Sequence, residues 1–80
     1  MATRNLIGRQ VRSIRLADAQ GMTQEVLAAR LQTLGWDVDR FIVSKIERQQ
    51  RQVTDREVYL LARALRVSID CLFPKDLADL

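Results

Sequence analysis

The sequence has no histidine, a single cysteine, one proline and no long apolar run, and each scarcity excludes a class of protein. Without histidine, and with Cys71 as the only thiol, neither a zinc site nor an intrachain disulfide is expected. No run of about 18 apolar residues is present, so no membrane span is expected. The N-terminal sequence MATRNLIGRQ lacks the apolar core of a secretory signal, and we therefore expect an intracellular, cytoplasmic protein.

The residues that carry most enzyme chemistry are equally scarce. No histidine is available as a general base, and no glycine-rich loop is present to cradle a phosphate. Cys71 lies in an apolar segment with no neighbouring base to activate it. Asp37 and Asp39 flank a turn and are interpreted as helix caps instead of paired catalytic acids. The sequence therefore predicts a protein that is not an enzyme, and it implies no cofactor and no metal.

Arginine, in contrast, is abundant, and it is unevenly placed. The chain carries 13 basic and 10 acidic residues, a net charge of +3. Residues 1–17 contain four arginines and no acid, and residues 40–51 contain four basic residues against Glu47. Such segregation suits a nucleic-acid-binding surface, because guanidinium groups bond phosphate and guanine through a planar fork. The alternative is a codon bias toward arginine in a GC-rich genome.

Apolar residues recur with helical spacing along almost the whole chain, which predicts an all-α fold. Helix starts are marked by a capping residue with a hydrophobic staple around it. The expected N-caps are Thr23, Asp39, Thr54 and Ser68, of which Thr54 also has the spacing of a capping box with Glu57. The five expected helices run over about 5–18, from Thr23 to Leu34, from Asp39 to about Gln49, from Thr54, and briefly from Ser68. We expect a single domain over 1–80, with a core over about 5–73 and a short tail over 74–80.

The third expected helix has two different faces. Val43 and Ile46 fall on one side and are expected to pack against the second helix. The opposite side is basic and carries Arg40, Phe41, Ser44, Lys45 and Arg48. An α-helix of this kind fits the major groove of B-DNA, whereas the simpler alternative is a solvated amphipathic helix.

Three segments, taken in order, resemble the phage Cro and repressor-type helix-turn-helix family. They are MTQEVLAARL, VSKIERQ and VTDREVYLLARALRVSIDCLF, and the resemblance covers roughly residues 6 to 73. It implies a compact five-helix domain of the lambda-repressor type, in which the second and third helices form the DNA-reading pair. The turn between them, QTLGWDVD, is longer than is usual in the family. Gln49 stands where many members have glycine, so a less tight loop is expected after the third helix.

The resemblance also implies roles for individual residues. Gln24 is expected to contact a phosphate beside the N-terminal amides of its helix. Ala28 is the small residue expected where the two helices cross, and Arg15 and Glu47 are expected to form an ion pair. The positions that face base edges are matched by Arg40, Phe41, Ser44 and Lys45. The loop that follows the DNA backbone is matched by Arg48, Gln50, Arg51 and Gln52.

Four residues have structural interpretations as well. Phe41 is expected either to press on a thymine methyl group or to pack against Trp36. Trp36 is expected to pack over the turn, with a dimer contact as the alternative. Tyr59 is expected in the core or in an interface, and Cys71 is expected to be a small buried apolar residue.

These observations favour a sequence-specific DNA-binding regulator, a repressor that binds a palindromic operator as a homodimer. The last helix and the tail are candidates for the dimer surface, because Leu77 and Leu80 otherwise have no expected role. The alternative is a protein-interaction module on the same fold, such as an antitoxin whose DNA binding is secondary to binding its toxin. A scaffold that has lost DNA binding is a third interpretation, which the basic face disfavours.

Overall fold

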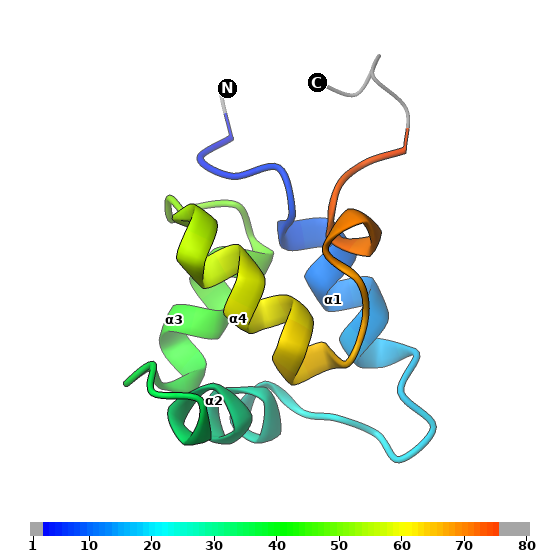
Figure 1. Cartoon of the computed structure of the whole chain (residues 1–80), viewed down its shortest axis with the longest axis vertical. Helices are drawn as coiled ribbons and strands as arrows, with labels where there is room; N and C mark the ends of the chain where they lie inside the picture. The colour runs from blue at the N-terminus through cyan, green and yellow to red at the C-terminus, as the bar shows by residue number, and fades with distance from the viewer. Residues whose placement is uncertain (1–2, 76–80) are drawn as a thin grey trace.

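The computed structural model describes residues 3–75 and builds them entirely from helices and connecting loops (Figure 1). The elements are α1 (Gly8–Leu16), α2 (Gln24–Thr33), α3 (Arg40–Glu47), α4 (Asp55–Leu65) and a 3₁₀ turn, η1 (Ile69–Leu72). The all-α fold expected from the sequence is confirmed. The described residues contain four α-helices, however, and the fifth expected helix is the four-residue 3₁₀ turn. None of these helices is long and apolar enough to cross a membrane.

The expected capping residues fix three of the helix starts. The side chains of Thr23 and Asp39 accept hydrogen bonds from the backbone N–H groups of Val26 and Ile42, respectively. Thr54 and Glu57 form the complete capping box, in which each side chain bonds the other residue's backbone N–H. Ser68 makes no such cap bond. With no side-chain cap at its start and Pro74 soon after, the last segment does not extend beyond a single turn.

The core is shared by all five elements. Figure 1 shows α4 in front of α3 and beside α1, with α2 below them. Ala28 is buried, as expected for a small residue at the helix crossing. The expectation for Cys71 was wrong, because Cys71 is exposed. Tyr59 is also exposed, which excludes the core and leaves an interface as its expected place. The buried apolar residues are Ile7, Val11, Met22, Leu27, Ala28, Leu31, Val38, Val43, Ile46, Leu61, Ala62, Ala64, Leu65 and Leu72.

The connection between α2 and α3 is ordered by its own hydrogen bonds. Gly35 ends α2, as expected. Its φ is +95°, a conformation that does not continue an α-helix and that glycine adopts without the strain a Cβ would cause. The N–H of Trp36 then donates to the carbonyl of Leu31, and the indole packs partly buried against the core. The side-chain amide of Gln32 donates to the carbonyl of Val38 at 2.6 Å. These contacts fix the direction in which α3 begins.

Candidate nucleic-acid interface

Helix α3 has the two faces predicted for it. Val43 and Ile46 are almost completely buried, with exposed fractions of 1% and 0%. The residues of the opposite face are Arg40, Phe41, Lys45 and Arg48, which are exposed, and Ser44, which is half-buried. Phe41 has an exposed fraction of 62%, so it is not part of the core. A single exposed apolar ring is common on protein surfaces, so the exposure of Phe41 does not by itself indicate a contact with another molecule.

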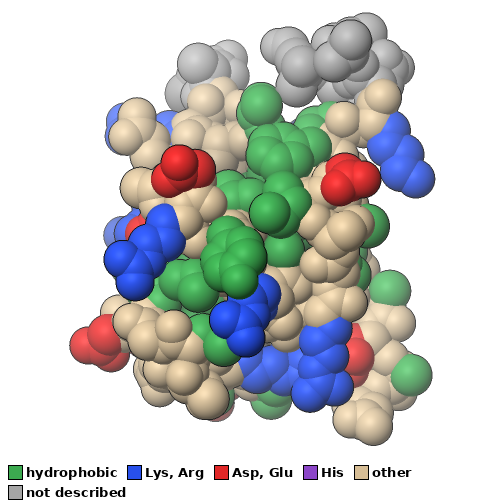
Figure 2. Space-filling view, in the orientation of Figure 1, with side chains coloured by type: hydrophobic (Ala, Val, Ile, Leu, Met, Phe, Trp, Pro, Cys, Tyr) green, Lys and Arg blue, Asp and Glu red, His purple; other side chains and the backbone are tan. Residues whose placement is uncertain are grey.

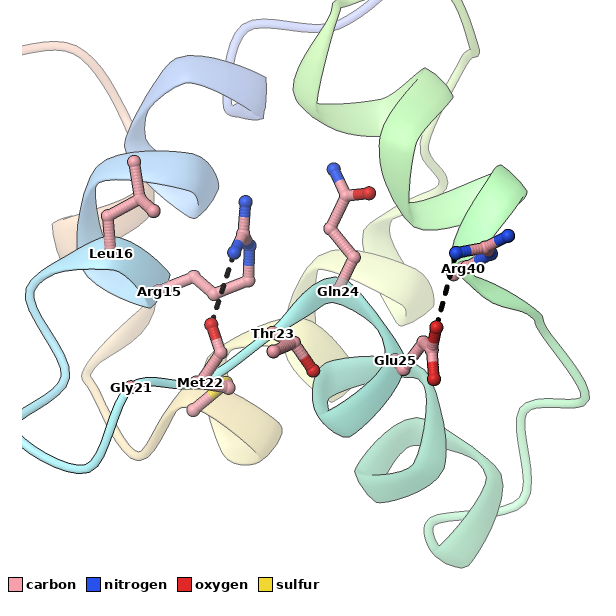
Figure 3. Close-up of a pocket in the computed structure, with 8 residues that line it drawn as sticks. All are labelled: Arg15, Leu16, Gly21, Met22, Thr23, Gln24, Glu25 and Arg40. Carbon is pink, nitrogen blue, oxygen red and sulfur yellow. Dashed lines mark hydrogen bonds and ion pairs between the residues drawn. The ribbon is translucent and has the colours of Figure 1, made fainter.

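A buried ion pair joins α1 to the end of α3. The guanidinium of Arg15 donates to both carboxylate oxygens of Glu47, with Nε–Oε2 at 2.7 Å and an Nη2–Oε1 distance of 2.9 Å. The two side chains have exposed fractions of only 9% and 1%. The hydrogen bond with Glu47 raises the pKa of Arg15 above its ordinary value, against the opposing effect of burial. Arg15 also donates to the carbonyl of Met22, just before α2, at 3.1 Å (Figure 3).

Gln24 is tied to the same carboxylate. Its side-chain nitrogen donates to Oε1 of Glu47 at 3.1 Å, so α1, α2 and α3 meet at one acid. Figure 3 shows Gln24 standing at the start of α2, between α1 and α3. One of its two N–H groups is used in this bond, which leaves the other available to a ligand. The position of Gln24 is therefore set by the protein before any ligand arrives.

Asn5 and Gly8 hold the other end of α1 against α3, and sequence analysis missed both. The amide nitrogen of Asn5 donates to the carbonyls of Ile46, at 3.1 Å, and Arg51, at 2.9 Å. Its amide oxygen accepts from the N–H of Gly8 at 2.8 Å. A Cβ on Gly8 would lie 2.2 Å from the carbonyl oxygen of Ile46, so only glycine permits this approach. An Asn shortly before a helix is recognisable in the sequence as a capping signal, but nothing in the sequence indicates that it also contacts α3.

The loop after α3 is closed by Gln49 in a left-handed conformation, with a φ of +60°. Its N–H donates to the carbonyl of Ile46 and that of Gln50 donates to Lys45, the pattern of a Schellman ending. The side chain of Gln49 also donates to the carbonyl of Asn5 at 3.1 Å. The expectation of a looser loop was wrong, because these bonds hold Gln49 in a conformation that normally favours glycine.

Two of the predicted DNA-contacting arginines already have partners within the chain. Arg40 forms an exposed ion pair with Glu25 at 3.2 Å (Figure 3). Its guanidinium also lies 5.0 Å from the centre of the Phe41 ring. Arg51 bonds both carboxylate oxygens of Glu57, at 3.0 and 3.2 Å.

Arg51 also stacks 5.6 Å from the Trp36 ring. It therefore braces the turn before α3 against the start of α4. Arg40, in contrast, lies on the exposed side of the helix.

The described residues contain no cluster of acidic or thiol side chains suited to a metal ion.

Comparisons with known proteins agree with this architecture. A helix-turn-helix family profile matches residues 11–70, three quarters of the chain. The chain is similar to the restriction-modification controller protein C.AhdI from Aeromonas hydrophila, with 34% identity and a TM-score of 0.69 over 84% of this chain and 87% of that one. For a variant of the controller protein C.Esp1396I the identity is 35% and the TM-score 0.63, over 78% of this chain and 70% of that one.

A third solved structure, the hypothetical transcription factor NHTF from Neisseria, is 27% identical with a TM-score of 0.71, over 92% of this chain and 78% of that one. No curated protein sequence matches the chain. The family profile spans α2 and α3 together with most of α1 and all of α4, so the match covers the elements that build the exposed face. The family is non-enzymatic. The chain belongs to the Cro/repressor-type helix-turn-helix family of DNA-binding transcriptional regulators.

Proposed function

We propose that the protein is a sequence-specific DNA-binding repressor that inserts α3 into the major groove of an operator. The observation that carries the proposal is the sidedness of α3. Val43 and Ile46 fix it to the core, while Phe41 and Lys45 project from it into solvent. One face of α3 is anchored in the core, and the exposed face carries basic side chains and one apolar ring. A helix of this kind matches the width and the chemistry of the DNA major groove.

The outward side chains divide into two groups by what they are able to reach. Arg40, Phe41, Ser44 and Lys45 project from the exposed turns of α3 and are proposed to read base edges. Gln24, at the start of α2, is proposed to contact a phosphate beside the helix N-terminus. Arg48 and Arg51, at and after the end of α3, are proposed to follow the backbone. For Arg51 this contact must be shared with Glu57, which already binds its guanidinium.

A homodimer on a two-fold symmetric site is the arrangement that one small domain needs for specificity. Each copy makes few contacts, so two copies are proposed to bind half-sites roughly 34 Å apart. Figure 2 shows hydrophobic side chains gathered along the middle of the face formed by α4 and η1. Tyr59, Ile69 and Phe73, with exposed fractions of 49%, 43% and 38%, belong to these elements or follow them directly, and we place the dimer surface here. Leu77 and Leu80, also expected to contribute, lie outside the described residues.

The regulated genes are proposed from the likeness to two controller proteins. Both are described as restriction-modification controllers, and their similarity to this chain extends over most of its length. We propose that this protein likewise controls the genes of a restriction-modification system. The connection of residues 34–39 between α2 and α3, which we interpret as longer than the family's usual turn, sets the angle at which α3 enters the groove.

Selection of bound duplexes from a random DNA pool, at near-physiological salt, tests the proposal. Enrichment of a palindrome whose half-site centres are about one helical turn apart would support a dimeric operator-binding protein. Weak binding of all sequences alike, or no binding, would contradict sequence-specific recognition. That result would favour the alternative, a protein-interaction module of the antitoxin type.

A further inference from the structure

A groove of about 580 Å³ runs between α1 and α3, beside the face that is proposed to enter the DNA. Its walls are Arg9, Arg12 and Ser13 from α1, Gln24 at the start of α2, Ser44 from α3, and Arg48 at the C-cap of α3. We call this hollow the α1–α3 groove. Arg9 and Arg12 are three residues apart on one helix, so their side chains share a face. The sequence marked residues 1–17 as a basic segment suited to nucleic acid, but it assigned no individual contact to Arg9 or Arg12.

The α1–α3 groove is strongly positive. The side chains of Arg9, Arg12 and Arg48 are exposed, and within residues 3–75 none of the three forms an ion pair. Glu47 also lines the groove, but its carboxylate is bonded to the guanidinium of Arg15, which balances its charge. Three cations thus surround an open hollow whose one acid is already paired.

The start of α2 adds to this positive potential. Gln24 is the first residue of α2, and its backbone lies where the unpaired N–H groups of the helix carry a partial positive charge. Figure 3 shows its side chain rising between α1 and α3. Helix N-termini with nearby basic side chains are sites where phosphate groups bind. The groove therefore combines three guanidinium groups, a helix N-terminus and the hydroxyl of Ser44 around one space.

We propose that the α1–α3 groove is a binding site for the phosphate backbone of one DNA strand, with Arg9 and Arg12 as its outer phosphate ligands. This assignment rests on the proposed function, because α3 must enter the major groove for a backbone to lie along its flank. It extends the DNA footprint from α2 and α3 to α1. It also explains why α1 carries arginines on its exposed side, while the charge of Glu47, the acid that lines the groove, is balanced by Arg15.

Salt-dependent binding of the selected operator measures the number of phosphates that each variant contacts. The variant is Arg9→Gln with Arg12→Gln. Its matched control is Arg30→Gln with Arg66→Gln, which removes the same charge from two residues that line neither the α1–α3 groove nor the proposed dimer surface. The groove variant should lower the slope of log affinity against log salt by about two for each bound subunit. Between 50 and 200 mM salt, its affinity should then fall roughly 12-fold less per subunit than that of the unmodified protein. The control should leave the slope unchanged.

Three further results decide the assignment. Arg9→Lys with Arg12→Lys should keep the slope, because a phosphate contact needs charge and not a guanidinium fork. Equal loss of slope in the groove variant and the control variant would overturn the proposal, since the effect would then follow net charge alone. An unchanged slope in the groove variant, with the operator still bound, would overturn it while leaving the proposed function intact. If the unmodified protein binds no DNA, both are overturned.

Discussion

The guanidinium of Arg15 donates two hydrogen bonds to the carboxylate of Glu47, and this pair joins α1 to the helix proposed to read DNA. Both side chains are buried, so neither charge is able to return to water when its partner is lost. Glu47 also receives a bond from Gln24, at 3.1 Å. The carboxylate is thus the point at which three helices are fixed relative to one another.

Replacing Glu47 with alanine should therefore strand a buried cation and lower the free energy of unfolding by about 3–5 kcal/mol. Glu25 provides the control, because its ion pair with Arg40, at 3.2 Å, is exposed. Loss of such a surface pair costs only about 0.2–1 kcal/mol. Urea unfolding followed by far-ultraviolet circular dichroism measures both. Equal losses in Glu47→Ala and Glu25→Ala would contradict a structural role for the buried pair.

A methyl group at position 8 should also be destabilising. In Gly8→Ala the new Cβ would meet the backbone oxygen of Ile46 at 2.2 Å, and a helix backbone moves aside only at a cost. Overpacking of this kind typically lowers the free energy of unfolding by about 1–3 kcal/mol. Ala17→Gly, at the exposed C-cap of α1, controls for a change of helix propensity without a close approach. Thermal unfolding that shows Gly8→Ala to be as stable as the unmodified protein would disprove the close approach.

Asn5 and Gly8 also show that contacts between residues far apart in the sequence were not predictable. Helix starts at Thr23, Asp39 and Thr54 were predictable, because a cap and the N–H that it bonds are only three residues apart. Asn5 bonds carbonyls that lie 41 and 46 residues away, and no local pattern indicates such partners.

Burial within residues 68–73 was also predicted wrongly, for a related reason. The apolar composition of residues 68–73 suggested a packed helix, but the segment makes one turn and presents Cys71 and Ile69 to solvent. Arg51 has the charge and loop position expected of a backbone ligand. Its bonds with Glu57 follow only from the folded path of the loop.

The contact between Arg51 and Glu57 predicts a pH-dependent part of the stability. Burial would raise the pKa of Glu57, but hydrogen bonds from Arg51 and Thr54 and the charge of Arg51 outweigh it, and the pKa lies below its ordinary 4.5. A lowered pKa means that this stabilisation is complete above about pH 4.5 and is lost as pH falls through the folded-state value. Glu57→Gln should therefore lower the melting temperature at pH 7 by more than it does at pH 3. A difference that stays constant over this range would contradict the assignment.

Phe41 offers a test of how α3 recognises sequence. If its exposed ring, which lies against the Arg40 guanidinium, presses on a thymine methyl group, removal of that methyl should weaken binding. Replacing single thymines of the selected operator by deoxyuridine removes only the methyl groups, so it leaves every hydrogen bond of the base pair in place. The unmodified protein should lose affinity at one such position in each half-site, whereas Phe41→Ala should bind the thymine and deoxyuridine duplexes alike. Lys45→Ala is the control, because it alters a neighbouring side chain and should keep the methyl effect. If the unmodified protein tolerates every deoxyuridine substitution, Phe41 does not read thymine through its methyl group.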